Sequence, residues 1–150
     1  MKRRDAVRAL RDGGVGGVAG LPALVEQHER STDVPCSLGV QGTPRPLDAE
    51  AGMALYRAVQ EALANARQHA VGAPVEVKLS WSDEQAELEV VTATGARHEH
   101  LDGSGLGAGL QGLAERAALV GGDFRAGPTE DGFRVELHVP TQRTATQEVR

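Results

Sequence analysis

Residues 55–70 read LYRAVQEALANARQHA, and this stretch decides the fold. Its apolar side chains recur at the i, i+4 spacing of a helix that buries one face, with small alanines between them. The positions that define this face are Leu55, Val59, Leu63 and Ala66. We therefore expect a long amphipathic helix around which the rest of the chain packs.

Three polar residues form a stripe on the same predicted helix. Glu61, Asn65 and His69 follow one another at i, i+4 and i+8, so they share one side. Magnesium prefers oxygen ligands and keeps several of its waters, and this set of side chains suits a hydrated metal ion beside a phosphate chain. A polar stripe that only faces solvent is the alternative, and the spacing alone is compatible with both.

A cluster of glycines precedes a second predicted helix. The glycines are Gly103, Gly105, Gly107 and Gly109, and the segment LQGLAERAALVGG follows them. A glycine-rich loop that enters a helix exposes backbone N–H groups to an anion. A flexible loop without any ligand is the alternative here.

The composition limits the possible functions. The chain has 150 residues, which suits one domain with a real core, and its formal charge is −5. That charge, with only 3% aromatic residues, argues against a nucleic-acid partner, because neither a basic surface nor stacking platforms are available. The single cysteine, Cys36, excludes an internal disulfide and is expected to be buried. No apolar run approaches the roughly 20 residues that span a bilayer, so we expect a cytoplasmic segment without membrane contact.

Periodicity predicts the order of elements. Helices are expected at 21–30, at 48–70 with Asp48 as the N-cap, and from the glycine cluster to about residue 120. Strands are expected at 36–40, 75–79, 88–92, 123–126 and 133–139. This order predicts an α/β (α+β) fold, a two-layer sandwich of a mixed sheet on three helices. Residues 1–20 are expected to hold a short helix and a glycine-rich linker, 21–140 the domain, and 141–150 a flexible tail.

Several motifs together resemble a known family. YRAVQEALANARQHA resembles the N-box, GAGLQGLAERAALVGG the second glycine box and DGFRVELHVP the closing strand of the ATP-binding domain of sensor histidine kinases. The match is closest to the nitrate-sensor and lipid-fluidity-sensor branch, within the superfamily of gyrase, Hsp90, histidine kinase and MutL. The resemblance covers residues 21–140 and implies a Bergerat-type fold, with the nucleotide between the long helix and a mobile loop called the ATP lid.

The resemblance also implies residue roles, with ATP and Mg²⁺ as cofactors. Glu61 matches the catalytic glutamate, a general base or a residue that orients water, and Asn65 matches the magnesium ligand. His69 falls near the phosphates, although a surface histidine at a helix C-terminus is an equal alternative. Arg116 is expected to pair with a carboxylate or to lie on the helix surface. The other expected nucleotide-binding positions are Gly95, Gly105, Gly107, Gly109 and Leu110.

The sequence departs from the family pattern at the base-binding motif. Ala93 stands where the family has an aspartate or asparagine that reads adenine, and Phe133 replaces the threonine that supports adenine in many members. Losing such a hydrogen bond to a charged or amide group commonly weakens binding roughly ten- to a hundredfold. Thr92 or Thr94 could recover part of it through a hydroxyl or a water.

A phosphate-accepting histidine is also missing from the expected place. The roughly 20 residues before the matched region contain no histidine, and His28 lies in LVEQHER, which is not the expected context. His98, His100 and His138 lie in the presumed lid and last strand. The resemblance therefore implies a partner, a histidine-bearing dimerisation domain in trans or in a longer chain, and indirectly a response regulator.

Three hypotheses remain open. The favoured one is the catalytic, Mg-ATP-binding domain of a two-component histidine kinase, an enzyme that is incomplete without its phosphoacceptor. A stand-alone serine kinase of the anti-sigma-factor type is the second, and GLAERAALVGG discriminates against it. The third is a degenerate nucleotide-binding or protein-interaction module, a pseudokinase, for which Ala93 is the main argument.

Overall fold

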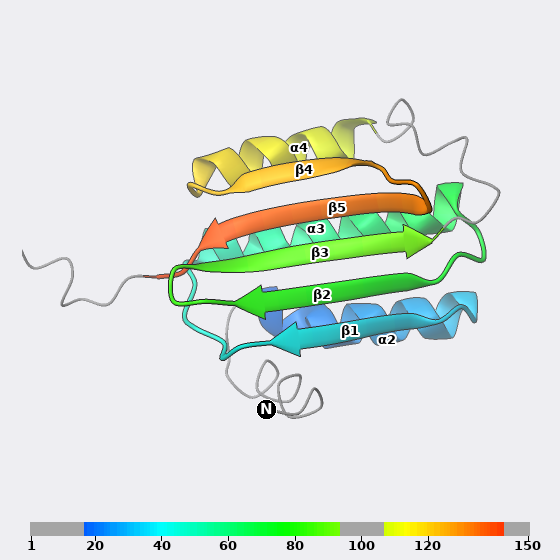
Figure 1. Cartoon of the computed structure of the whole chain (residues 1–150), viewed down its shortest axis with the longest axis horizontal. Coiled ribbons are helices and arrows are strands. Elements are labelled where there is room, and N and C mark those ends of the chain that lie inside the picture. Colours follow the sequence, from blue (N-terminus) through cyan, green and yellow to red (C-terminus); the bar gives the residue numbers. More distant parts are fainter. Residues whose placement is uncertain (1–16, 94–106, 143–150) are drawn as a thin grey trace, which may run out of the picture.

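The computed structural model describes residues 17–93 and 107–142, which form two layers (Figure 1). One layer is a five-stranded sheet of β1 (Cys36–Gln41), β2 (Val75–Trp81), β3 (Gln85–Ala93), β4 (Asp123–Pro128) and β5 (Gly132–Pro140). The other layer holds the short 3-10 helix η1 (Gly17–Gly20) and the helices α2 (Leu21–Thr32), α3 (Ala49–His69) and α4 (Gly107–Leu119). The predicted fold class, three helices on a mixed sheet, is confirmed.

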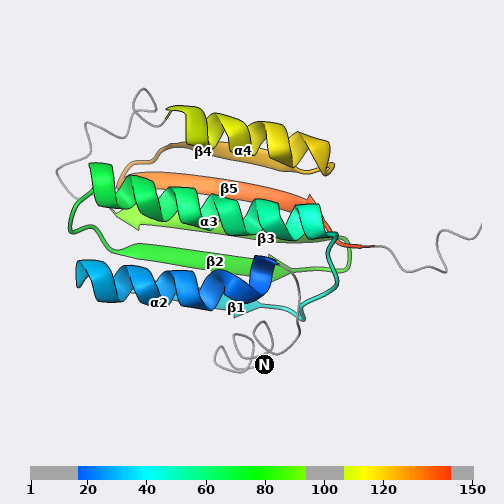
Figure 2. The same ribbon diagram turned by 180° about the vertical axis from the view of Figure 1, so that it is seen from behind.

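The sheet has the strand order β1-β2-β3-β5-β4. β1 and β2 pair in parallel, with Cys36 opposite Val75, and the other neighbours pair antiparallel. A parallel pair needs a crossover connection, and α3 supplies it between β1 and β2. In the view from behind, α3 lies between α2 and α4 across the middle of the sheet (Figure 2). The long predicted helix is therefore the central helix of the layer.

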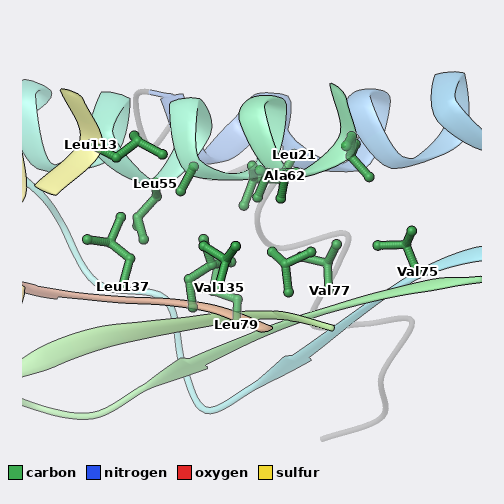
Figure 3. Close-up of a cluster of buried hydrophobic side chains, with 14 of the residues drawn as sticks. Leu21, Leu55, Ala62, Val75, Val77, Leu79, Leu113, Val135 and Leu137 are labelled. Atoms are coloured by element: carbon green, nitrogen blue, oxygen red, sulfur yellow. The ribbon is translucent and has the colours of Figure 1, made fainter. Parts of the chain in front are cut away.

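Aliphatic side chains fill the space between the layers (Figure 3). Strand residues alternate between the core and the opposite face, so Val75, Val77 and Leu79 point toward the helices while Glu76 and Lys78 do not. The largest fully buried aliphatic side chains are Leu21, Leu55, Leu79, Leu88 and Leu137. Cys36 is buried, as expected, and burial raises the pKa of its thiol to about 11, with a smaller contribution from Glu29.

The packed part of the chain begins earlier than expected. Gly17–Gly20 form η1 rather than a free linker, and Val18 is fully buried. A Cβ at Gly17 would lie only 2.6 Å from the carbonyl oxygen of Gly52, so η1 lies directly on the first turns of α3. Placing residues 17–20 in a linker is therefore wrong, while the helix expected in residues 1–12 lies outside the described residues.

The ends of α2 and α3 lie within two residues of the predicted positions, but the capping contact at the start of α3 differs from the prediction. α2 carries Pro22 in its first turn and ends before Asp33, which adopts a left-handed conformation at φ 58°. Asp48 is the N-cap of α3, as expected, but its side chain makes no capping hydrogen bond. Its Oδ1 instead accepts a hydrogen bond from Gln142 Nε2 at 3.3 Å.

Two further boundaries differ from the prediction. β3 begins at Gln85, three residues before the start of the strand predicted at 88–92. Thr141 and Gln142 were expected in a flexible tail, yet their N–H groups donate to the carbonyl oxygens of Glu84 and Pro46. The domain therefore continues to Gln142 at least.

Membrane-spanning helices need both length and apolar character, and none of the helices in residues 17–93 and 107–142 combines the two.

Candidate functional site

The polar stripe of α3 lies on the second half of the helix. Glu61, Asn65 and His69 are all half-buried, so they are neither core residues nor freely solvated ones. His69 is the last residue of α3, and Ala70 follows as the C-cap, donating its N–H to the carbonyl oxygen of Ala66 at 3.0 Å. The structure thus places all three predicted side chains along one helix, between its middle and its C-terminal end.

Asn65 has an unsatisfied donor. Its amide nitrogen, Nδ2, is buried and has no hydrogen-bond partner in the described part of the chain. A small cavity of about 10 Å³, roughly the volume that one water needs, adjoins it. Its lining comes from Ala62, Asn65, Ala66, Thr92, Phe133 and Val135. A buried donor without a partner costs about 1–3 kcal/mol, so an acceptor that reaches this amide, a water or a ligand oxygen, would be bound favourably.

The end of β3 directs Thr92, not Ala93, toward Asn65. Thr92 is buried on the core face and lines the cavity beside Asn65. Ala93 is exposed, pairs with Gly132, and lines a different hollow of about 300 Å³ together with Val91 and residues of α2, β1 and β2. The alternation of Leu88, Val90 and Thr92 in the predicted strand 88–92 indicates the core face for Thr92, and the structure confirms this placement.

The first turn of α4 approaches Glu61. A Cβ at Gly109 would clash with the Glu61 carboxylate, so only glycine permits this contact without a shift. A helix N-terminus carries partial positive charge and free N–H groups, which favours an anion there. The neighbouring Leu110 is buried in the core and anchors the turn. Gly107 is the first residue of α4, whereas Gly95 and Gly105 lie outside the described residues.

A hollow of about 820 Å³ lies at the other end of the sheet from Asn65. Its lining comes from the β2–β3 hairpin, the α4–β4 turn, the end of β5 and the loop before α3, and includes Arg45, Asp83, Asp123 and His138. We assign the candidate site to the Asn65 end despite the smaller cavity there, because that end holds the unsatisfied amide and the glycine contact. Arg116, expected in an ion pair or on the surface, is half-buried on α4.

Neither of the other two described histidines lines the Asn65 cavity. His28 is buried between α2 and α3, where burial and the positive charge of Arg67 lower its pKa. His138 lies on β5 at the far hollow. His98 and His100 lie outside the described residues.

The comparisons with known proteins agree with this architecture. Residues 50–143 match the family described as histidine kinase-, DNA gyrase B- and HSP90-like ATPase. The sensor histidine kinase MctS of Rhizobium johnstonii is 35% identical over 129 residues, which are 84% of this chain and 28% of that protein. This chain therefore spans little more than a quarter of that relative.

Solved structures show the same fold at lower identity. A histidine kinase domain from the Erythrobacter litoralis blue-light activated histidine kinase is 21% identical, with a TM-score of 0.59 over 79% of this chain and 56% of that one. The Acinetobacter baumannii histidine kinase AdeS is 10% identical, with a TM-score of 0.64 over 93% of this chain and 76% of that one.

This chain belongs to the histidine kinase-, DNA gyrase B- and HSP90-like ATPase family, and its domain is of the sensor histidine kinase type. Family membership implies nucleotide binding, usually with Mg²⁺. The residues fit such a ligand, because Asn65 offers an amide with a free donor and the missing side chain at Gly109 lets the first turn of α4 lie against the Glu61 carboxylate. No group of three His, Cys, Asp or Glu side chains in the described ranges forms a metal site.

Proposed function

We propose that this chain is the catalytic domain of a two-component sensor histidine kinase, which binds Mg-ATP and donates the γ-phosphate to a histidine that is not present in this sequence. The observation that carries the proposal is the unpartnered, buried amide of Asn65, on the same helix face as Glu61. Most buried polar groups in folded proteins have a hydrogen-bond partner, so an unpartnered donor calls for an explanation, and a bound ligand would supply one for Asn65. Mg²⁺, when bound, would neutralise charge on the transferring phosphoryl group.

Each residue of the site has a distinct proposed role. Asn65 directs its amide oxygen to the metal ion and its amide N–H to a ligand oxygen. Glu61 orients water or accepts the proton of the attacking group, from a position against the first turn of α4. His69 donates a hydrogen bond to a phosphate. The backbone N–H groups at Gly107, Gly109 and Leu110 face the phosphate chain, as do those proposed at Gly95 and Gly105.

The proposed partners follow from this role. A histidine-bearing dimerisation domain, in trans or in a longer chain, receives the phosphate and passes it to a response regulator. Both steps are proposed to take place in the cytoplasm. Catalysis would consist mainly of positioning and charge stabilisation, since phosphoryl transfer needs little covalent help from the protein.

A pseudokinase is the second candidate, and one observation favours it. Exposed Ala93 offers no group that could recognise a base. Against it, Thr92 lines the Asn65 cavity at the end of the same strand, so a hydroxyl-bearing residue remains next to the position where the family has its base-reading group. The anti-sigma-factor type of serine kinase has no structural observation of its own in its favour.

Calorimetric titration of the full chain with a non-hydrolysable ATP analogue, with and without magnesium, tests the proposal. We expect binding with a Kd between micromolar and sub-millimolar that requires magnesium. Asn65→Ala should abolish this binding while the far-UV circular dichroism spectrum stays unchanged. Arg57→Ala, an exposed position on the same helix, is the matched control and should bind normally.

Two results would count against the proposal. Equal affinity of the Asn65→Ala variant would remove the metal and ligand assignment. No binding at millimolar analogue by the unaltered chain would favour the pseudokinase.

A further inference from the structure

A buried histidine joins α2 to the last turn of α3. His28 is only 3% exposed and continues the buried stripe of α2 that begins with Leu21 and Val25. Its ring nitrogen Nδ1 lies 3.3 Å from Nη1 of Arg67, an exposed residue of α3. The two residues are 39 positions apart in the chain, so this is a tertiary contact between two helices.

The chemistry of this pair fixes the protonation state of the ring. A guanidinium carries only N–H donors, so Nδ1 must be the acceptor. A ring that accepts at Nδ1 is neutral and carries its proton on Nε2. Burial and the positive charge of Arg67 both lower the pKa of His28 below its ordinary value, which agrees with a neutral ring.

The two ends of the contact differ in how firmly they are held. The end of α2 is tied internally, because the His28 carbonyl oxygen accepts from Thr32 Oγ1 at 2.7 Å and from Ser31 Oγ at 3.3 Å. The last turn of α3 is the end of a helix, where fraying is expected. Beyond it lies Gly72 at φ 86°, which belongs to no helix.

We propose that His28 is a positioning residue, which holds Arg67 and through it the last turn of α3 against α2, and that protonation of His28 releases this turn. Arg67 lies between Asn65 and His69 in sequence, so the contact braces the segment that carries both candidate site residues. We name this contact the His28–Arg67 brace. The proposal does not depend on which ligand the site takes.

The direction of the pH effect follows from the charges around the ring. Arg67 faces His28 from α3, and a second positive charge on the ring would repel it. Cys36, on the strand that packs against α2, stays a neutral thiol with a pKa of about 11, and Glu29 of α2 itself acts on Cys36. In the unfolded chain His28 takes up a proton more readily, so acidification below about pH 6.5 weakens the brace and the fold.

Amide hydrogen exchange of the full chain at pH 7.5 tests the brace without any nucleotide. Arg67→Met keeps the aliphatic stem of an exposed residue but removes the donor. We expect amide exchange at residues 66–70 to rise about three- to tenfold in Arg67→Met and in His28→Leu, the range that loss of one hydrogen bond gives. His28→Gln restores a neutral acceptor and should keep the protection of the unaltered chain. Unchanged exchange in Arg67→Met would overturn the proposal.

A second comparison isolates the protonation step. Between pH 7.5 and pH 5.5, after correction for intrinsic exchange rates, the unaltered chain should lose protection at residues 66–70, while His28→Gln should not, because glutamine does not titrate. Equal losses in the two proteins would mean that another group causes the pH dependence, and the proposed switch would be wrong. Since no ATP analogue is present, a failure here leaves the nucleotide titration above unaffected.

Discussion

The two halves of α3 differ in the burial and the hydrogen bonding of their side chains. In the first half, small and aliphatic residues such as Ala51, Ala54 and Leu55 are buried, and η1 lies over Gly52. In the second half, Glu61 and Asn65 leave polar atoms at the surface or in a small cavity, and one buried donor has no partner. Folding thus buries the apolar side chains of the first half. In the second half, the unpartnered donor of Asn65 keeps a free-energy cost that a bound ligand would offset.

The largest expected effect comes from the first half. Leu55→Ala removes a fully buried side chain and should lower the free energy of unfolding by about 2–5 kcal/mol. Urea denaturation followed by circular dichroism measures this change. Met53→Ala, a partly exposed position in the same half, should stay within about 0.5 kcal/mol of the unaltered chain. Equal losses at both positions would remove the distinction between buried and exposed positions in this half.

The contact between the second half and α4 can be tested with a matched pair of glycines. Alanine at Gly109 would push the Glu61 carboxylate aside, whereas nothing lies within 4 Å of a Cβ at Gly112. Gly109→Ala should weaken binding of the ATP analogue roughly tenfold, as loss of a hydrogen bond to a charged group does. Gly112→Ala should keep the affinity and raise the thermal midpoint, because alanine favours a helix by up to about 1 kcal/mol. Normal affinity in Gly109→Ala would show that Glu61 need not hold this position.

Asn65 should behave as a residue that serves binding at the expense of stability. Asn65→Ala removes the unsatisfied donor and introduces a better helix former, so the free energy of unfolding should stay unchanged or rise by up to about 1 kcal/mol. Urea denaturation without nucleotide measures this. A loss above 2 kcal/mol would instead make Asn65 a structural residue, and the contrast between the halves would disappear.

The smallest effect is expected at the N-terminus of α3. Asp48 makes no capping hydrogen bond, so only its favourable charge near the helix end and its bond to Gln142 are lost in Asp48→Ala. We expect a destabilisation of about 0.5 kcal/mol. A loss of 1–2 kcal/mol would indicate that a true capping bond forms in solution.

Most of the fold could be predicted because it depends on local periodicity. The apolar spacing of residues 55–66 and the alternation in Val75, Val77 and Leu79 each fix which face is buried, and the elements were found in the correct order. The helix period likewise placed Glu61, Asn65 and His69 on one side. These features follow from residues close together in the sequence.

The rest depends on tertiary contacts that no local pattern contains. Three contacts depend on how the helices and strands are placed in space. Gly109 contacts Glu61, Thr92 lines the cavity of Asn65, and His28 lies against Arg67. Asp48 illustrates the same limit on a smaller scale, because its position as N-cap was predictable but its bond to Gln142 was not.

The crossover through α3 also has a consequence for the order of folding events. β2 and β3 are neighbours in sequence and form a tight hairpin, with Ser82 N–H bonded to the Gln85 carbonyl oxygen. β1, by contrast, lies at the edge of the sheet and pairs with β2, and the whole of α3 lies between these two strands in the sequence. Closing that long loop takes more time than closing a hairpin. During refolding, amides of β2 and β3 should therefore become protected first, and β1 should join the sheet only after α3 has formed.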